Sequence, residues 1–204
     1  MSFVAVLGLA GVGKTSVVRR LSLDLDAKAF CEPDRKDWPA FIEDGFVDFS
    51  FDVLEWFRCY QVDLIRRASK YGKCGLSICD AYYHKIMIGY VSHQSSNWII
   101  PKNDPYFSVL MRILELDSKY LPNASMIIFL SAEYEDWAKM VNSRSQQGDD
   151  ILLSQAFASQ DSMRQAAEAH ARLERIPLLH VQQTYGRLDE TVLKCAEFIR
   201  ENMK

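Results

Sequence analysis

The chain has 204 residues, of which 49% are apolar and 25% charged, and its formal net charge is −3 at pH 7. This composition excludes an intrinsically disordered chain and supplies the core of one folded domain. The sequence has no sustained basic run and no apolar stretch longer than a strand. Nucleic acid is therefore not favoured as a main partner, and a membrane span is not expected.

The first predicted element is a buried strand at residues 3–7, which are all apolar. It leads directly into a P-loop (Walker A) sequence, the phosphate-binding pattern of a glycine, four residues and Gly-Lys-Thr: Gly8-Leu9-Ala10-Gly11-Val12-Gly13-Lys14-Thr15. Glycines let such a loop turn its backbone N–H groups toward phosphate oxygens. The next apolar residues, Val17, Val18 and Leu21, have the spacing of a helix that buries one face. Strand, loop and helix together predict a nucleotide-phosphate site rather than an ordinary glycine-rich turn.

Two side chains of this loop have chemistry of their own. Lys14 supplies a positive charge for the β and γ phosphates, and the hydroxyl group of Thr15 is a ligand for Mg²⁺. The helix that follows contributes unpaired backbone amides and the positive end of its dipole. The nucleotide-binding residues expected in this segment are Gly8, Ala10, Gly11, Val12, Gly13, Lys14, Thr15 and Ser16.

Strand and helix signals alternate along the rest of the chain. Apolar runs predict strands at 27–31, 76–79, 126–130 and 176–181, and helical periodicity predicts helices at 51–70, 82–91, 106–120, 133–141, 151–175 and 188–202. The polar segment 93–105 is predicted to be a surface insertion, and 142–150 a short lid. Five apolar strands with helical crossovers predict an α/β fold in one domain, 1–204, whose five-stranded parallel sheet has helices on both faces.

Carboxylates follow two of the predicted strands. Because ligands of parallel sheets bind beyond the carboxyl ends of the strands, we expect Glu32, Asp80 and residues 182–185 to share one edge with the P-loop. Asp80 is a candidate anchor for Mg²⁺, and the alternative is a cap of the next helix. Glu32 is a candidate general base for phosphoryl transfer, and the alternative is a solvated loop glutamate.

The helix at 51–70 and the lid carry further candidates. Trp56, Arg58 and Gln61 lie within two turns of that helix. An aromatic ring for stacking and an amide with both a donor and an acceptor suit a nucleobase, although a core tryptophan beside solvated polar residues explains the same pattern. Arg144 lies in the Gly-, Ser- and Gln-rich run of the lid, where it could bring a cation onto a transferring phosphate.

Taken in order, these motifs resemble the deoxynucleoside kinases and thymidylate kinases. The residues that carry the resemblance are the P-loop, Glu32-Pro33 followed by Trp38, Trp56-Phe57-Arg58-Cys59-Tyr60-Gln61, and Ile78-Cys79-Asp80-Ala81-Tyr82. The resemblance implies that Glu32 is the base for a sugar 5′-hydroxyl and that Gln61 binds the nucleobase in a pocket lined by Trp56 and Arg58. It further implies that Asp80 serves the metal, Arg144 the lid, and residues 182–185, including Gln183 and Tyr185, the adenine of ATP.

The sequence departs from this family pattern at two places. Both kinase groups have an arginine directly after the acidic residue of the third strand, and here that position is Ala81. Lys85, about one turn further on, is a candidate replacement, although a flexible ammonium group does not reproduce a bidentate guanidinium. The lid, where the family clusters arginines, offers Arg144 with Lys139 a turn earlier.

We therefore expect ATP-dependent phosphoryl transfer to a nucleoside or, second, to a nucleoside monophosphate, with ATP and Mg²⁺ as cofactors. Two alternatives stay open: a nucleotide-binding regulatory protein on a weakened kinase fold, and a kinase of another small hydroxylated metabolite.

The five cysteines form no CxxC pair and predict free thiols. The early first strand leads us to expect no signal peptide and a cytoplasmic location. The expected partners are a small-molecule substrate, no nucleic acid, no membrane, and a second copy in a candidate homodimer.

Overall fold

The computed structural model of the chain describes residues 3–40, 42, 51–97, 99–143 and 150–203, and within them the centre is a five-stranded parallel sheet. The strand order is β2-β3-β1-β4-β5, so β1 lies in the middle and β2 and β5 form the edges. The strands are β1 (Phe3–Gly8), β2 (Lys28–Phe30), β3 (Ser77–Cys79), β4 (Met126–Ala132) and β5 (Leu178–Gln183). The α/β fold predicted from the sequence is confirmed.

The order of the strands follows from their sequences. Every residue of β1 and β4 is buried, as expected for strands that are apolar on both faces and covered by helices on both sides. The edge strand β5 has polar, exposed side chains at His180 and Gln182. The parallel register pairs Ala5 with Cys79 on one side and with Ile127 on the other, so the carboxyl ends of β1, β3 and β4 meet at one edge of the sheet.

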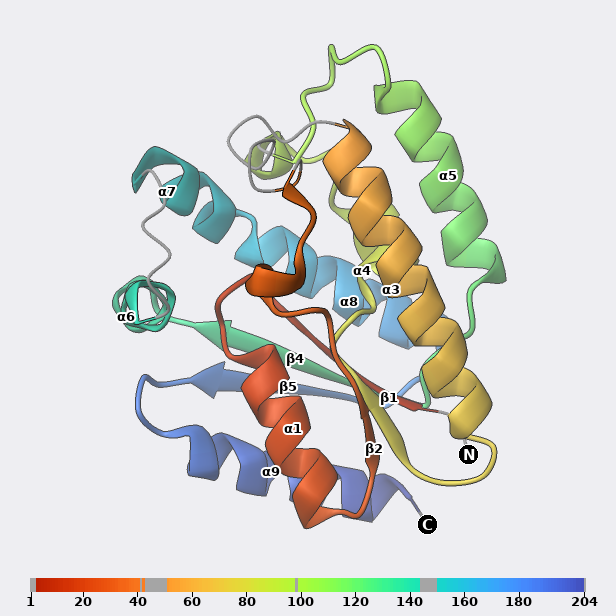
Figure 1. Cartoon of the computed structure of the whole chain (residues 1–204), viewed down its shortest axis with the longest axis vertical. Helices are drawn as coiled ribbons and strands as arrows, with labels where there is room; N and C mark the ends of the chain where they lie inside the picture. Colours follow the sequence, from red (N-terminus) through yellow and green to blue (C-terminus); the bar gives the residue numbers. More distant parts are fainter. Residues whose placement is uncertain (1–2, 41, 43–50, 98, 144–149, 204) are drawn as a thin grey trace.

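Helices cover both faces of this sheet (Figure 1). The α-helices are α1 (Lys14–Asp24), α3 (Phe51–Tyr71), α4 (Tyr83–Ile86), α5 (Phe107–Tyr120), α6 (Tyr134–Asn142), α7 (Asp150–Ala158), α8 (Gln160–Glu174) and α9 (Leu188–Asn202). Helices α1 and α9 pack together on one face, and α3 and α8 cover the other, with α5 outside them. Within the described residues, no helix is long and apolar enough to span a membrane.

Three predicted elements differ from the structure. The apolar run at 176–181 led us to place the fifth strand too early, because polar residues continue the β5 ladder to Gln183. The predicted helix at 151–175 is two helices, α7 and α8, which meet at Ser159, where the serine hydroxyl group bonds back to the carbonyl of Ala156. The predicted helix at 82–91 is shorter, since α4 ends at Ile86 and a 3₁₀ turn, Met87–Gly89, follows.

The predicted surface insertion at 93–105 is partly wrong. Ile99 and Ile100 are buried, and the hydroxyl-bearing Ser96 in the 3₁₀ turn Gln94–Ser96 is fully buried as well. This turn packs against α7, and the hydroxyl groups of Ser95 and Ser162 lie 3.3 Å apart. The segment thus contributes side chains to the core beside α7 and α8, and polar residues alone did not indicate this.

Candidate nucleotide-binding site

The P-loop follows β1 with the conformation that its glycines require. Gly8, Gly11 and Gly13 have φ angles of +139°, +82° and +89°, in a region that side chains rarely adopt. A Cβ atom at Gly8 would lie 2.2 Å from the carbonyl oxygen of Leu130, and one at Gly11 would lie 2.6 Å from a methyl carbon of Val141. Only glycine fits at these two places, so this part of the motif is dictated by backbone geometry and space.

The carbonyl groups of the P-loop are held by side-chain donors. Lys14 is buried, and its Nζ atom donates to the carbonyl of Leu9 at 2.8 Å. The other donors come from elsewhere in the chain: the Tyr83 hydroxyl to Gly8 O at 2.6 Å, the Trp137 indole Nε1 to Ala10 O at 2.8 Å, and the Gln183 amide Nε2 to Val12 O. The loop is thereby fixed by α4, α6 and β5 as well as by its own lysine.

Tyr83 and Trp137 are site residues that the sequence analysis did not identify. Tyr83 lies three positions after Asp80, but a tyrosine in an apolar segment reads as a core residue. Trp137 lies in the middle of α6 and is 2% exposed, and a tryptophan on an amphipathic helix gave no signal of contact with the loop. Gln183 is a buried residue of β5 whose amide contacts Val12 of the P-loop, and its contact with adenine stays a prediction.

A pair of oxygen-bearing side chains lies at the carboxyl ends of β1 and β3. The Thr15 Oγ1 atom donates to Asp80 Oδ2 at 2.7 Å, and Asp80 Oδ1 accepts the backbone N–H of Glu32 at 2.9 Å. Thr15 and Asp80 therefore present a hydroxyl and a carboxylate oxygen side by side next to Lys14. Mg²⁺ is commonly held by one or two protein oxygens together with phosphate oxygens and water, so this donor set fits the ion.

Glu32 lies beside this pair, directly after β2. Burial and the neighbouring charge of Asp80 raise the pKa of Glu32 to about 7, although Lys14 opposes the shift. Burial also raises the pKa of Asp80, while the hydrogen bond from Thr15 acts in the opposite direction. The sheet edge thus brings together Lys14, Thr15, Glu32 and Asp80, as expected from the sequence, and it gives Glu32 a pKa suited to proton transfer near neutral pH.

Helix α3 supplies a polar residue and aromatic rings next to Glu32. The Gln61 amide Nε2 donates to the Glu32 carboxylate, while the Gln61 side-chain oxygen is buried and has no hydrogen-bond partner among the described residues. The Trp56 ring packs 6.3 Å from the ring of Trp38 and 6.0 Å from that of Tyr60, measured between centroids. Gln61 and Trp56 are thus in one region with the candidate base, and the roles of both in nucleobase binding stay predictions.

Arg58, one turn before Gln61, is committed to an ion pair. Its Nε and Nη2 atoms donate to the two carboxylate oxygens of Asp117 in α5, at 2.7 and 2.8 Å, and Glu55 lies 3.6 Å away. The hydrogen bonds with Asp117 raise the pKa of Arg58. The guanidinium group therefore joins α3 to α5. A contact between Arg58 and a nucleobase would have to come from a side chain that this ion pair already holds in place.

The expectation that Lys85 replaces the missing arginine is wrong. Lys85 is buried, and its Nζ atom donates to the carbonyl of Leu121 at 2.7 Å. Leu121 precedes the amino end of β4, whereas the P-loop lies beyond the carboxyl end of β1, so Lys85 reaches the opposite end of the sheet. Ala81 is fully buried and leaves its position without a cation.

Some predicted residues are not brought into this site. Arg144, with the rest of 144–149, lies outside the described residues. Tyr185 follows β5 and is 48% exposed, and the neighbouring Gln182 amide donates to Glu133 at 2.7 Å. No described group of three or more His, Cys, Asp or Glu side chains could hold a metal ion.

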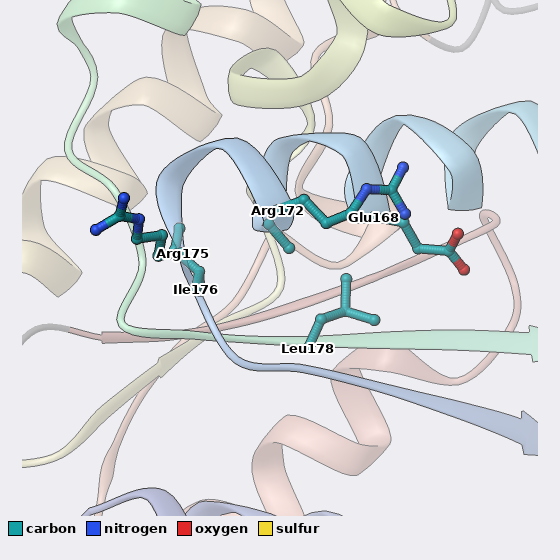
Figure 2. Close-up of a pocket in the computed structure, with 6 residues that line it drawn as sticks. Glu168, Arg172, Arg175, Ile176 and Leu178 are labelled. Carbon is teal, nitrogen blue, oxygen red and sulfur yellow. The ribbon is translucent and has the colours of Figure 1, made fainter.

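A hollow of about 360 Å³ opens between the end of α8 and the start of β5 (Figure 2). The residues that line it are Glu168, Ala171, Arg172, Arg175, Ile176 and Leu178. Leu178 points toward α8, while Arg175 points away from the other labelled side chains. The hollow lies at the amino end of β5, so it is separate from the P-loop and contains none of the predicted site residues.

Comparisons with known proteins bear on the fold. No protein-family model matches the chain, and no curated protein matches it in sequence. A thymidylate kinase structure from Candida albicans superposes with a TM-score of 0.63 at 21% identity, covering 99% of this chain and 92% of that one. A deoxyadenosine kinase structure from M. mycoides with dCMP and dCDP bound gives a TM-score of 0.66 at 13% identity, covering 98% of each chain.

A second structure of the M. mycoides enzyme, with dATP bound, gives a TM-score of 0.62 at 10% identity and covers 97% of this chain and 100% of that one. Each of these similarities extends over almost the whole chain, and the resemblance noted in the sequence motifs is thereby confirmed at the level of the fold. The chain has the P-loop fold of the thymidylate kinases and deoxynucleoside kinases.

Proposed function

We propose that this protein is an ATP-dependent kinase that transfers the γ-phosphoryl group to the 5′-hydroxyl of a nucleoside, with a nucleoside monophosphate as the second candidate acceptor. The observation that carries the proposal is the cluster of Lys14, Thr15, Glu32 and Asp80 at one edge of the sheet. A phosphate-binding loop and a carboxylate with a pKa of about 7 are joined there through Asp80. These are the parts that phosphoryl transfer from ATP to a hydroxyl group needs.

Each group has a part in the reaction. Lys14 and the amides of the loop bind the β and γ phosphates. Thr15 and Asp80 would hold Mg²⁺, which when bound offsets the charge of the phosphate oxygens. The acceptor oxygen attacks the γ-phosphorus, the bond from that phosphorus to the bridging oxygen of ADP breaks, and the hydroxyl proton passes to ionised Glu32.

The region between Glu32 and α3 is the proposed acceptor site. Gln61 has a buried oxygen that lacks a partner among the described residues, so a ligand that donates a hydrogen bond would complete it. Trp56, five positions earlier on α3, packs against the ring of Trp38 and is the proposed aromatic partner of the ligand. The M. mycoides deoxyadenosine kinase binds dCMP, dCDP and dATP in its structures, which supports a nucleoside or nucleotide as the ligand here.

The described cations near Glu32 already have partners, and this favours a nucleoside over a nucleoside monophosphate as the acceptor. A second phosphate would require positive side chains, preferably arginines, around the acceptor. Among the described residues of this region, Arg58 is paired with Asp117 and Arg19 with Asp34, and Lys85 lies at the other end of the sheet. Arg144 of the predicted lid stays the candidate cation for the transferring phosphate.

The second candidate function is a nucleotide-binding protein with weak or no catalysis. The specific observation in its favour is Ala81, which is fully buried where the kinases have an arginine and which Lys85 does not replace. Removing one preorganised donor from a phosphoryl-transfer site costs about 100-fold or more in rate. ATP binding would survive such a loss, because Lys14 and the N–H groups of the P-loop are still present.

The test is transfer of γ-labelled phosphate from ATP across a panel of nucleosides and nucleoside monophosphates. Wild type would be assayed beside Lys14→Ala and Ala81→Arg. We expect a labelled nucleoside whose formation Lys14→Ala abolishes. Transfer by Ala81→Arg alone would support the second candidate, and ATP binding with no labelled acceptor in any variant would overturn the kinase proposal.

A further inference from the structure

The carbonyl groups of Gly8, Ala10 and Val12 in the P-loop accept hydrogen bonds from side chains outside the loop, and this determines where the N–H group of the next residue points. In a trans peptide the carbonyl of one residue and the N–H of the next lie in one plane and point in opposite directions. The hydrogen bond to the carbonyl of Gly8 therefore orients the N–H of Leu9, and the bond to the carbonyl of Ala10 orients the N–H of Gly11. These inward N–H groups are the ones that a phosphate would accept hydrogen bonds from.

Tyr83 contacts both the loop and its lysine. Its hydroxyl group donates to Gly8 O at 2.6 Å, and its ring centroid lies 5.4 Å from Lys14 Nζ. Burial, with the negative charge of Glu32, raises the pKa of the Tyr83 phenol well above its usual value, so the phenol keeps its proton. A neutral phenol at this place can donate to the carbonyl, and its ring face attracts the ammonium group.

Trp137 contacts the next part of the loop from α6. The indole N–H, which can only donate, bonds to Ala10 O at 2.8 Å. The ring is held by aromatic neighbours, with its centroid 5.5 Å from that of Phe157 and 6.1 Å from that of Tyr134. A side chain that is 2% exposed and packed between two rings has little freedom to release the carbonyl.

We infer that Tyr83 and Trp137 are positioning residues that hold the P-loop with its N–H groups facing the phosphates of the nucleotide. This inference rests on the proposed function, because it concerns the same nucleotide site, but it requires only that ATP binds. Without these donors, the peptides after Gly8 and Ala10 can rotate and direct carbonyl oxygens toward the phosphates. The bound anion would then meet electronegative oxygens instead of N–H groups, and its affinity falls.

The experiment measures the dissociation constants of ATP and of inorganic tripolyphosphate by isothermal titration calorimetry. The variants are Tyr83→Phe, which removes only the hydroxyl group, and Trp137→Phe, which removes the N–H donor and keeps an aromatic ring. A hydrogen bond contributes about 1 kcal/mol, which corresponds to about fivefold in affinity. We expect each variant to bind both ligands about fivefold more weakly and the double variant about 25-fold more weakly, since the two bonds hold different peptides.

The matched control is Tyr82→Phe. The Tyr82 hydroxyl accepts the N–H of Ala124 at 3.1 Å near the amino end of β4, so its loss removes a buried hydrogen bond away from the loop. We expect Tyr82→Phe to lower the melting temperature and to leave the affinity for ATP unchanged. If Tyr83→Phe and Trp137→Phe also lose melting temperature but bind ATP and tripolyphosphate as wild type does, their role is structural and the inference is wrong.

The same data separate the inference from the proposed function. If wild type binds ATP but phosphorylates no acceptor, the kinase proposal fails while the loss of affinity in the two variants still supports the inference. If wild type binds neither ATP nor tripolyphosphate, both are overturned.

Discussion

The Thr15 hydroxyl donates a 2.7 Å hydrogen bond to Asp80, and this contact joins the P-loop to the end of the strand next to it. The two residues lie 65 positions apart in the sequence, and the parallel pairing of β1 with β3 brings them together. Asp80 also accepts the backbone N–H of Glu32 from β2, so one carboxylate connects the nucleotide side and the acceptor side of the proposed site.

The first prediction concerns this carboxylate. Asp80→Asn keeps the shape of the side chain but removes its charge, so the site should lose most of its affinity for Mg²⁺. We expect phosphoryl transfer to fall about 100-fold or more, because the charge on the transferring phosphate is no longer offset. Initial rates over a series of Mg²⁺ concentrations would measure the effect, and calorimetry of ADP in the absence of the metal is the control, where affinity should change little. A full rate at ordinary Mg²⁺ concentrations would contradict the metal role.

The second prediction concerns pH and Glu32. The pKa of Glu32 is raised from 4.5 to about 7, so the fraction of ionised base grows through neutral pH. We expect kcat/KM to rise as the pH increases from 6 to 8 with a midpoint at about 7, and Glu32→Gln to abolish transfer while ATP still binds. A rate–pH profile for wild type with the acceptor identified above is the measurement. A flat profile over this range would argue against Glu32 as the base.

The same shift makes a prediction about stability. The pKa of Glu32 is higher in the folded state than in the unfolded state, so its ionised form opposes folding. The stability that the protonated side chain contributes is therefore lost as the pH rises from about 4.5 through about 7. Glu32→Gln removes the ionisation. We expect the melting temperature of the variant, relative to that of wild type, to be higher at pH 8 than at pH 5. The opposite order would mean that the carboxylate is stabilised in the folded protein.

The third prediction compares two glycines with nearly the same backbone conformation. Gly11 and Gly186 have φ angles of +82° and +81°, but a Cβ atom at Gly11 would lie 2.6 Å from Val141, whereas one at Gly186 meets nothing within 4 Å. Gly186→Ala should cost about 1–2 kcal/mol from backbone strain alone. Gly11→Ala should cost more, since Val141 must also move.

Urea unfolding of the two variants measures this difference, and ATP calorimetry accompanies it. We expect Gly11→Ala to weaken ATP binding as well, because the displaced peptide carries N–H groups of the phosphate site. Equal losses of stability in the two variants would show that the contact between the loop and α6 is looser than the structure indicates.

The fourth prediction concerns the ion pair between α3 and α5. Asp117 has 7% of its side chain exposed and receives two hydrogen bonds from Arg58, so removing the arginine leaves a buried carboxylate with the His84 imidazole, whose Nδ1 atom lies 3.6 Å from Asp117 Oδ2, as its remaining neighbour. We expect Arg58→Met to cost about 3 kcal/mol in the free energy of unfolding, and the double variant Arg58→Met/Asp117→Leu to recover most of it. A urea double-mutant cycle is the measurement. If the double variant is no more stable than Arg58→Met, the cost comes from lost packing and not from the uncompensated charge.

The sequence was sufficient to predict those parts of the site that depend on local sequence rules. The glycines and Lys14 follow from what a loop around phosphate requires, and Glu32 and Asp80 follow from the rule that strand ends meet at one edge. The buried strands were equally clear because residues 3–7 of β1 and 126–130 of β4 are all apolar. These inferences depend on short sequence distances and on a known order of strands.

The rest depends on contacts between distant segments. Lys85 was assigned to the site from its distance along a helix, but α4 ends after one turn and the side chain extends toward Leu121. Gln183 was placed beyond β5 because the apolar run ends earlier than the hydrogen-bond ladder. Tyr83 and Trp137 bond to backbone carbonyls, which carry no sequence signal, so neither residue type nor spacing could reveal them.

The donors that hold the P-loop lie far along the chain, so the proposed nucleotide binding depends on how much of the chain has been synthesised. Tyr83, Trp137 and Gln183 are separated from the carbonyls that they hold by 75, 127 and 171 positions, so each of them is synthesised long after the P-loop. A nascent chain that stops before β5 contains the whole P-loop motif but lacks part of what shapes it. If ATP binds as proposed, it would have its full affinity only once β5 has been made, and its binding would stabilise chains that contain β5 in preference to shorter ones.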